Sequence, residues 1–279
     1  MRHVEFIDRE HFEKNYFRQY PTGKLAGFID FFWQTRFTSL LQKKANGFSD
    51  LLFPNTGYSY LINIGTPYVM MMGESSFPIK GDSFLPRHQR IECFHQPGNE
   101  IFGIKFRLSP VLLEKKINFS EYRKAMSPLS YLIDKQVVES VKREKEFSER
   151  VEILSSYFNK IIRQSGETSA PAKAVSSILH DCYQHNAFGA SIEDFAAAGG
   201  ISSRTLHRYF ECATSLSSKK TLQLMRIRKA VEELMHESPD WNFLNYGYYD
   251  YSHFYRHLVQ FMGKDDAGKF MSDRRGKRS

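Results

Sequence analysis

The sequence lacks most of the features that mark secreted, membrane-spanning or enzymatic proteins. Its 279 residues include only three cysteines, Cys93, Cys182 and Cys212, and no Cys-x-x-Cys pair. This argues against a disulfide scaffold and against a cysteine zinc site. No apolar run reaches the roughly 18 residues of a membrane-spanning helix, and the first residues do not form a signal peptide. These absences favour a reducing, cytoplasmic compartment and predict no membrane partner.

Motifs of catalysis are also missing. The chain contains no nucleophile elbow, no phosphate-binding loop and no dinucleotide-binding fingerprint. We therefore expect no enzyme activity, no catalytic residue and no cofactor.

Charge gives only a weak indication of a partner. The formal net charge is +8, which favours a polyanionic partner such as nucleic acid. The basic residues are spread over both halves of the chain, however, and a solvated basic surface explains the charge equally well.

The N-terminal half is rich in short segments that favour β-strands. Turn signals such as Pro54-Asn55-Thr56-Gly57 separate them. This pattern predicts a small antiparallel barrel or sandwich. The clearest segments are residues 28–37, 58–64, 68–72 and 102–108.

An apolar stripe at helical spacing follows the predicted strands. It consists of Phe147, Val151, Leu154, Phe158, Ile161 and Ile162. Such a stripe has two interpretations: it mediates a homodimer, or it packs on the β-rich region.

The segment Ser165-Gly166-Glu167-Thr168-Ser169-Ala170-Pro171 is small, polar and ends in proline. We interpret residues 165–171 as a linker. Residues 1–164 then form one domain, residues 172–271 a second, helical domain, and residues 272–279 a basic tail. The expected fold class is α+β.

A short pattern occurs twice in the helical domain. Gly200 precedes the triplet Leu206/Arg208/Phe210, and Gly247 precedes Phe254/Arg256/Leu258. A glycine turn before a short helix that is apolar inside and basic outside is the outline of a helix-turn-helix unit. Between the two units a longer helix is predicted from about residue 218 to 236. Its basic face consists of Lys219, Lys220, Arg226, Arg228 and Lys229.

These segments resemble the DNA-binding domain of a known family of bacterial regulators. Ser202–Phe210 and the Gly-aromatic-x-Asp-x-Ser-His-Phe core at 247–254 are similar to the two signatures of the AraC/XylS family. The resemblance covers about residues 172–271 and implies two helix-turn-helix units joined by a linker helix. Residues 28–33, 54–57 and 102–106 resemble a module that often precedes this domain and is assumed to sense an effector. The resemblance implies a sequence-specific, effector-controlled transcription regulator.

Two departures from the family pattern favour an alternative. Asn242-Phe243 replace the usual Ile-Ala pair, and Asp265-Asp266 replace Ser/Thr-Pro, which adds negative charge near the expected DNA surface. The alternative is an AraC-like interaction or co-regulatory protein with weakened specific DNA binding.

The positions within the motifs imply which residues contact double-stranded DNA. Arginine recognises guanine, whereas phosphate contacts position the protein without reading sequence. The start of the linker helix favours anions, so phosphate contacts are expected there. Tyr246, Tyr248 and Tyr249 are expected to pack inside. The expected contacts are Ser203, Arg204, His207 and Arg208 in the first unit, Tyr251, Ser252, Tyr255 and Arg256 in the second, and Lys219, Lys220 and Thr221 at phosphates.

Histidine pairs give two weak metal hypotheses. His253 and His257 have i, i+4 spacing, and His88 and His95 fall in the β-rich region, with Glu92 or Glu100 as a companion acid. Neither spacing is diagnostic, and we expect no metal. The remaining candidate partners are a small-molecule effector, RNA polymerase and a second copy of the chain.

Overall fold

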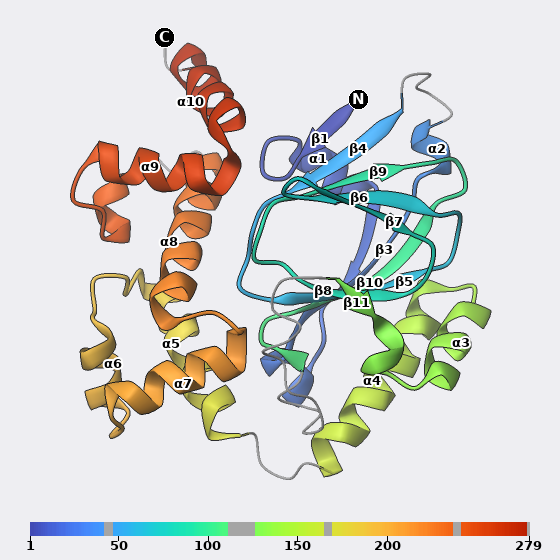
Figure 1. Ribbon diagram of the computed structural model, residues 1–279, viewed down its shortest axis with the longest axis horizontal. Coiled ribbons are helices and arrows are strands. Elements are labelled where there is room, and N and C mark those ends of the chain that lie inside the picture. The colour runs from blue at the N-terminus through green and yellow to red at the C-terminus, as the bar shows by residue number, and fades with distance from the viewer. Residues whose placement is uncertain (42–46, 111–125, 165–168, 237–240, 278–279) are drawn as a thin grey trace.

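The protein combines a β-rich N-terminal part with a helical C-terminal part, as Figure 1 shows. The computed structural model describes residues 1–41, 47–110, 126–164, 169–236 and 241–277. The predicted α+β class is confirmed. The described strands form two separate sheets, so the sandwich rather than the closed barrel is the N-terminal architecture.

The first sheet has five strands in the order β1-β4-β9-β6-β7. Strand β1 runs parallel to β4, whereas the other neighbours are antiparallel. The bounds are β1 (Arg2–Val4), β4 (Phe48–Leu52), β9 (Ile91–His95), β6 (Tyr68–Met72) and β7 (Ser75–Ile79).

The second sheet has six strands in the order β11-β8-β5-β10-β3-β2, all antiparallel. The four segments predicted as strands are confirmed: residues 28–37 contain β3, 58–64 contain β5, 68–72 form β6 and 102–108 overlap β10. The bounds are β11 (Ser127–Pro128), β8 (Ser83–Pro86), β5 (Tyr58–Asn63), β10 (Glu100–Phe106), β3 (Ile29–Arg36) and β2 (Tyr16–Gln19).

The second sheet is buried on both faces. Side chains alternate along a strand, so Leu61 of β5 joins a cluster with Tyr68 and Met70 of the first sheet. Its neighbour Tyr60 points to the opposite face, where its ring lies 6.3 Å from that of Phe158. Every residue of β5 is therefore buried.

Helix α4 (Phe147–Gln164) covers the outer face of the second sheet. Its predicted stripe packs there, with the Phe158 ring 5.6 Å from that of Phe106. The stripe thus serves the domain's own core. The other N-terminal helices are α1 (Arg9–Lys14), α2 (Thr38–Leu41), α3 (Lys135–Arg143) and the short 3-10 turns η1 (Gly23–Gly27) and η4 (Leu129–Tyr131).

The described residues of the C-terminal part form seven helical elements. Polar residues cap several of them: for example, Ser191 and Asp194 form a capping box, and the Ser202 hydroxyl accepts from the Thr205 amide. The elements are α5 (Ala170–His185), α6 (Ile192–Ala198), α7 (Ser203–Thr214), α8 (Ser218–Met235), η5 (Phe243–Tyr246), α9 (Tyr251–Met262) and α10 (Lys264–Lys277).

Two predicted boundaries differ from the structure. Residues 165–168 of the predicted linker lie outside the described residues, and residues 170–171 belong to α5. Helix α10 continues to Lys277, so residues 272–277 extend a helix and are not a separate tail.

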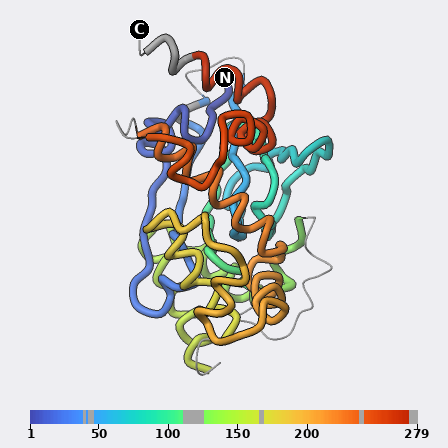
Figure 2. The backbone as a smooth tube through the Cα atoms, turned by 90° about the vertical axis from the view of Figure 1, so that its left-hand side faces the viewer, coloured from blue at the N-terminus to red at the C-terminus, as the bar shows by residue number. Residues whose placement is uncertain are grey.

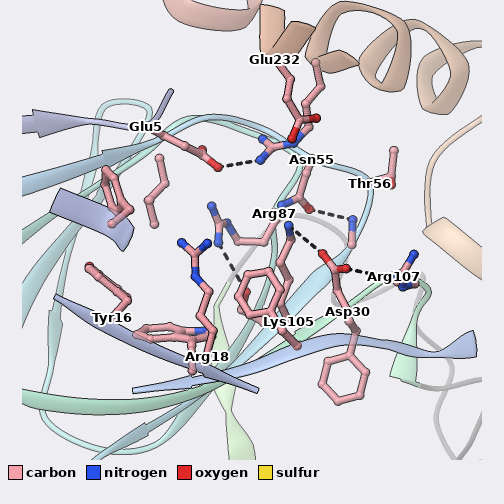
Figure 3. Close-up of a pocket in the computed structure, with 18 of the residues that line it drawn as sticks. Glu5, Tyr16, Arg18, Asp30, Asn55, Thr56, Arg87, Lys105, Arg107 and Glu232 are labelled. Carbon is pink, nitrogen blue, oxygen red and sulfur yellow. Dashed lines mark hydrogen bonds and ion pairs between the residues drawn. The ribbon is translucent and has the colours of Figure 1, made fainter. Parts of the chain in front are cut away.

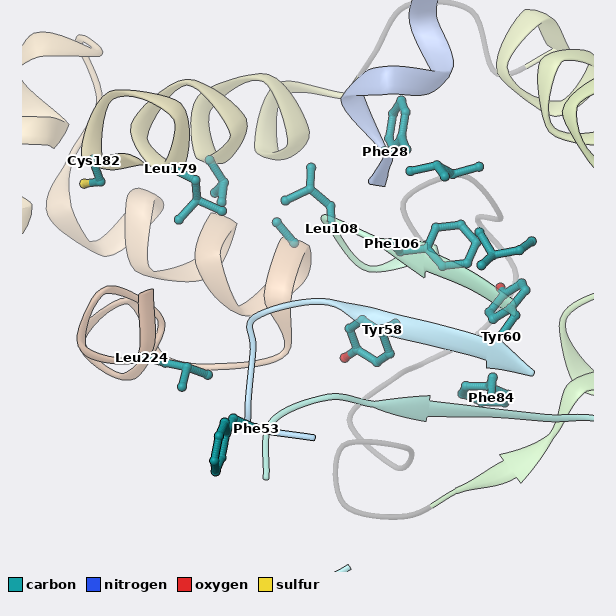
Figure 4. Close-up of a cluster of buried hydrophobic side chains, with 14 of the residues drawn as sticks. Phe28, Phe53, Tyr58, Tyr60, Phe84, Phe106, Leu108, Leu179, Cys182 and Leu224 are labelled. Atoms are coloured by element: carbon teal, nitrogen blue, oxygen red, sulfur yellow. The ribbon is translucent and has the colours of Figure 1, made fainter. Parts of the chain in front are cut away.

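One apolar core joins the two parts. Figure 4 shows buried side chains from Tyr60 and Phe106 on the sheet through Leu108 to Leu179 of α5. Arg2 of β1 lies 3.1 Å from Asp266 in the first turn of α10, and Figure 2 shows these two ends of the chain in the same region. The β-rich and helical parts are therefore packed together through these shared contacts.

Candidate nucleic-acid interface and interdomain cavity

The first helix-turn-helix unit consists of α6 and α7. Leu206 and Phe210 are buried, as the pattern predicts, which leaves Arg204 and Arg208 exposed on the opposite face. Ser203 is half-buried at the first turn of α7. His207 is exposed, but its Nδ1 lies 2.6 Å from the Ser218 hydroxyl. His207 therefore also ties α7 to the start of α8.

Two of the three residues expected to contact phosphates at the start of α8 are accessible to solvent. Lys219 and Lys220 are exposed. Thr221 is fully buried, and its hydroxyl donates to the Ser217 carbonyl at 3.0 Å. The expectation that Thr221 contacts a phosphate is therefore wrong, because its side chain faces the interior.

The rest of the predicted basic face of α8 is used inside the protein. Arg226 donates to the carbonyls of Gly247 at 3.1 Å and Phe188 at 2.8 Å, which links the two units. Lys229 is buried and pairs with Glu233 at 2.7 Å. These side chains hold the domain together and are not free for DNA.

The second unit places α9 after η5 and the Gly247 turn. Tyr251, Ser252 and Arg256 are exposed on α9. Tyr255 is half-buried, and its ring stacks on that of Tyr251 with centroids 5.9 Å apart. Three of the four residues predicted to contact DNA from α9 thus lie on its exposed face.

The tyrosines before α9 do not all pack inside. Tyr246 and Tyr248 are buried as expected, but the expectation for Tyr249 is wrong, since it is 88% exposed. Its ring stacks on that of His253 with centroids 6.1 Å apart. Tyr249 is thus an exposed aromatic side chain beside the predicted contacts.

Both departures from the family pattern have intramolecular roles. The ring of Phe243 stacks on Phe254 at 6.2 Å, so the larger side chain adds to the packing of the second unit. Asp266 is buried and accepts from Arg2 at 3.1 Å and from Arg90 at 3.3 Å. Its charge is therefore neutralised by the N-terminal domain, whereas Asp265 is exposed.

The two histidine pairs have different surroundings from those expected. His253 and His257 pack edge to face, and burial lowers the pKa of His257 to about 4. His88 lies against Tyr58, whereas His95 stacks on Phe37. The expected companion acids are wrong. Glu92 pairs with Arg2 and Glu100 with Arg36, and the carboxylate beside His95 belongs to Asp50.

A cavity of about 970 Å³ lies where the sheets meet α5 and α8 (Figure 3). Its wall mixes aromatic and charged groups from both parts of the chain. Arg228 of α8 binds Glu5 at 2.6 Å, and Lys105 binds Asp30 at 2.9 Å. Burial opposes ionisation of Glu5, but Arg228 and Arg87 hold its pKa below the ordinary value.

Arg87 differs from the other cations of the cavity. It is 9% exposed, and among the described residues no carboxylate lies within ion-pair distance of its guanidinium. Its polar side-chain contact is the Ser59 hydroxyl, 3.5 Å away, and Nε has no hydrogen-bond partner. Burial lowers its pKa from the ordinary value. No sequence pattern singles out Glu5, Arg87 and Lys105, because only the fold brings them together.

Among the described residues, no helix combines the length and apolar character needed to cross a membrane.

Comparison with known proteins gives distant structural likeness only. No protein-family model matches the chain, and no curated protein matches it. ToxT from Vibrio cholerae is similar over 92% of this chain and 98% of its own, with 10% identity and a TM-score of 0.45. A ToxT structure with a bound unsaturated fatty acid covers 79% of this chain and 90% of its own, with 11% identity and a TM-score of 0.42.

The AraC-like transcriptional activator CuxR covers 82% of this chain and 94% of its own, with 10% identity and a TM-score of 0.28. At these values the likeness assigns no function to the chain.

Proposed function

We propose that the protein is a sequence-specific DNA-binding transcription regulator of the AraC/XylS type. The observation that carries this proposal is the exposure of Arg204 and Arg208 on α7 together with Arg256 on α9, the two helices that follow the glycine turns. Their apolar partners Leu206, Phe210, Phe254 and Leu258 are all buried. Each helix thus has the two-sided character that a recognition helix requires.

The two units have different chemistry. Arg204 and Arg208 on the first can each bind the O6 and N7 atoms of guanine in a bidentate manner, which gives sequence selection. The second presents Tyr251, Ser252 and Arg256, and tyrosine selects bases less sharply than arginine. We propose that the first unit carries most of the specificity, and that Lys219 and Lys220 bind phosphates between the units.

Tyr249 joins this surface as an addition to the sequence prediction. It is exposed beside His253 at the entry of α9. We propose that its exposed phenol contacts a phosphate or a thymine methyl group of the DNA. Tyr249→Ala is expected to weaken DNA binding without lowering the free energy of unfolding.

Selection from a random DNA library tests the proposal. The wild-type protein is expected to enrich a site of two short boxes about one helical turn, roughly 34 Å, apart. Arg204→Ala is expected to lose the preference at one box, at a cost of about 1–3 kcal/mol. Lys160→Ala is the matched control, because Lys160 is an exposed cation on α4, outside the helical domain. Enrichment of no sequence above salt-sensitive background would refute the proposal.

The alternative of an interaction protein loses part of its motivation. It depended on Asn242-Phe243 and Asp265-Asp266. Phe243 and Asp266 have packing or pairing partners within the chain, whereas Asp265 is exposed. A homodimer and a contact with RNA polymerase stay predictions, to be tested by light scattering and by transcription from a selected site.

We further propose that a small anionic effector binds in the interdomain cavity. The support is Arg87, a buried cation without a carboxylate partner among the described residues, beside apolar and aromatic walls. A carboxylate on the effector would supply the missing counter-charge.

Thermal-shift measurements with benzoate and decanoate test the effector. Their uncharged counterparts, benzyl alcohol and 1-decanol, serve as controls. Either carboxylate is expected to raise the melting temperature of the wild type but not of Arg87→Met. Equal shifts from acid and alcohol would show that Arg87 does not select an anion.

A further inference from the structure

Three histidines surround one buried aspartate in the N-terminal domain. Asp50 is 1% exposed, and His3, His11 and His95 are each less than a tenth exposed. His11 Nε2 lies 3.1 Å and His3 Nδ1 3.7 Å from Asp50 Oδ1, and His95 Nε2 lies 3.6 Å from Asp50 Oδ2. No part of this cluster belongs to the DNA-binding surface.

The backbone holds these groups in place. His3 on β1 is the direct neighbour of Asp50 on β4 in a parallel register, and His95 comes from β9, the next strand. Helix α1 brings His11 over the same point, and the rings of His3 and His11 lie 3.7 Å apart. Three strands and a helix therefore converge on one carboxylate.

The inward atoms have no ordinary hydrogen bonds. Among the described residues, His3 Nδ1, His11 Nε2, His95 Nε2 and Asp50 Oδ1 all have no partner with hydrogen-bond geometry, although all are buried. Buried polar atoms are nearly always paired, because leaving one unpaired costs about 1–3 kcal/mol. Three of these atoms, His3 Nδ1, His11 Nε2 and Asp50 Oδ1, face one another and indicate a missing common partner, whereas His95 Nε2 faces the other carboxylate oxygen.

We propose that His3 Nδ1, His11 Nε2 and Asp50 Oδ1 bind a divalent transition-metal ion, with Zn²⁺ the best match. These three atoms lie within 4.8 Å of one another. Zinc bonds of about 2.0–2.2 Å to nitrogen and oxygen place neighbouring ligand atoms roughly 3.3 Å apart in a tetrahedron, so the ligand atoms must move by up to about 1.5 Å, and a water molecule supplies the fourth ligand. Two imidazoles and a carboxylate suit Zn²⁺ better than they suit Mg²⁺ or Ca²⁺, which prefer oxygen.

The surrounding groups orient the ligands. The Tyr16 hydroxyl donates to Asp50 Oδ2, which leaves Oδ1 for the metal ion. His95, which is not one of the three ligands, is held beside Asp50 because its Nδ1 lies 2.7 Å from Asn99 Oδ1. Such outer contacts are typical of histidine metal sites. Asp50 and His95 also line the interdomain cavity, which gives the ion a path of entry.

His11 sets one condition on the site. Its Nδ1 lies 3.0 Å from Asn15 Nδ2, whereas a metal ion on Nε2 requires the proton on Nδ1. The Asn15 amide must therefore turn to present its oxygen. A carboxylate at this position accepts a hydrogen bond from the Nδ1–H group without any such turn, so Asn15→Asp is expected to raise the Zn²⁺ affinity several-fold.

Calorimetric titration of the untagged, chelator-treated full-length protein with ZnCl₂ tests the proposal. One Zn²⁺ per chain is expected, with affinity reduced at least about tenfold in His11→Gln and in His3→Gln. His185→Gln, at an exposed histidine of α5, is the matched control. Absence of binding by the wild type, or binding that neither His3→Gln nor His11→Gln changes, would overturn the site.

Co²⁺ absorption and X-ray absorption of the wild-type protein give an answer that does not depend on variants that fail to fold. The expected spectrum has nitrogen and oxygen neighbours only. A sulfur neighbour near 2.3 Å would point instead to Cys93, the partner of Asp50 in the β4–β9 register, and would refute the ligand set. Neither readout involves DNA, so failure of the proposed regulator function leaves the site standing.

Discussion

Arg228 on α8 donates a 2.6 Å hydrogen bond to Glu5 Oε1 in the N-terminal domain. The same guanidinium donates to the Pro54 carbonyl at 3.1 Å and lies 4.8 Å above the ring of Phe6. A single side chain of the helix between the two DNA-binding units is therefore fixed by three groups of the other domain.

Removing this contact should loosen the domain interface. Arg228→Met leaves Glu5 partly buried without its cation, and we expect the free energy of unfolding to fall by about 2 kcal/mol. Urea denaturation measures it. Glu5→Gln in the Arg228→Met background is expected to restore part of the loss, because the unpaired charge is then gone. Strictly additive losses in the double variant would contradict direct pairing.

The two adjacent aspartates before α10 should behave differently. Asp266 is buried between Arg2 and Arg90, so Asp266→Asn is expected to lower the free energy of unfolding by about 1–2 kcal/mol. The matched change Asp265→Asn, at an exposed position, should alter it by less than about 0.5 kcal/mol. Thermal denaturation of both variants checks this, and equal stabilities would remove the role given to Asp266.

Lys219 and Lys220 should contribute salt-dependent affinity without selectivity. Replacing both by alanine is expected to weaken binding to every DNA sequence alike and to reduce the slope of log K against log salt by about 1–2. Fluorescence anisotropy at several salt concentrations measures the slope. Lys160→Ala should leave it unchanged, and loss of preference for one sequence would mean that these lysines contact bases.

His88 should make the protein less stable in weak acid. Burial lowers its pKa from 6.5 to about 4 in the folded state. Between these values the unfolded chain binds the proton and the folded chain does not, so the free energy of unfolding falls as pH drops from 6.5 to 4. His88 alone is expected to lower the free energy of unfolding by roughly 1–3 kcal/mol over this pH range.

Urea denaturation between pH 7 and 4.5 checks this share. His88→Gln is expected to flatten the dependence in part, since His257, with its pKa also lowered to about 4, acts in the same direction. His185→Gln should retain the full slope, because that side chain is exposed.

Local sequence predicted the elements better than it predicted the surroundings of single residues. The strands around Tyr60 and Ile104 and the helical stripe of α4 depend on neighbours close in the chain, and both predictions are confirmed. Tyr249 was placed wrongly because a turn residue has no periodicity that separates an inner from an outer face.

The histidine–aspartate cluster lay beyond any local pattern. His3, Asp50 and His95 meet through strand pairing across most of the N-terminal domain. Spacing alone paired His95 with glutamates that bind arginines instead. Long-range register decides such a site, and sequence distance carries no information about it.

The cavity wall is shared by both parts of the chain, with Glu5 and Arg87 on one side and Arg228 on the other. A molecule that fills this space therefore has a different affinity for chains whose parts are docked and for chains whose parts are not. If docking of the two parts also changes the affinity for DNA, then the small molecule and the DNA must change each other's dissociation constant by the same factor. A DNA fragment that carries the binding site can then help to identify the small molecule, because adding this DNA changes the dissociation constant of the small molecule by that same factor.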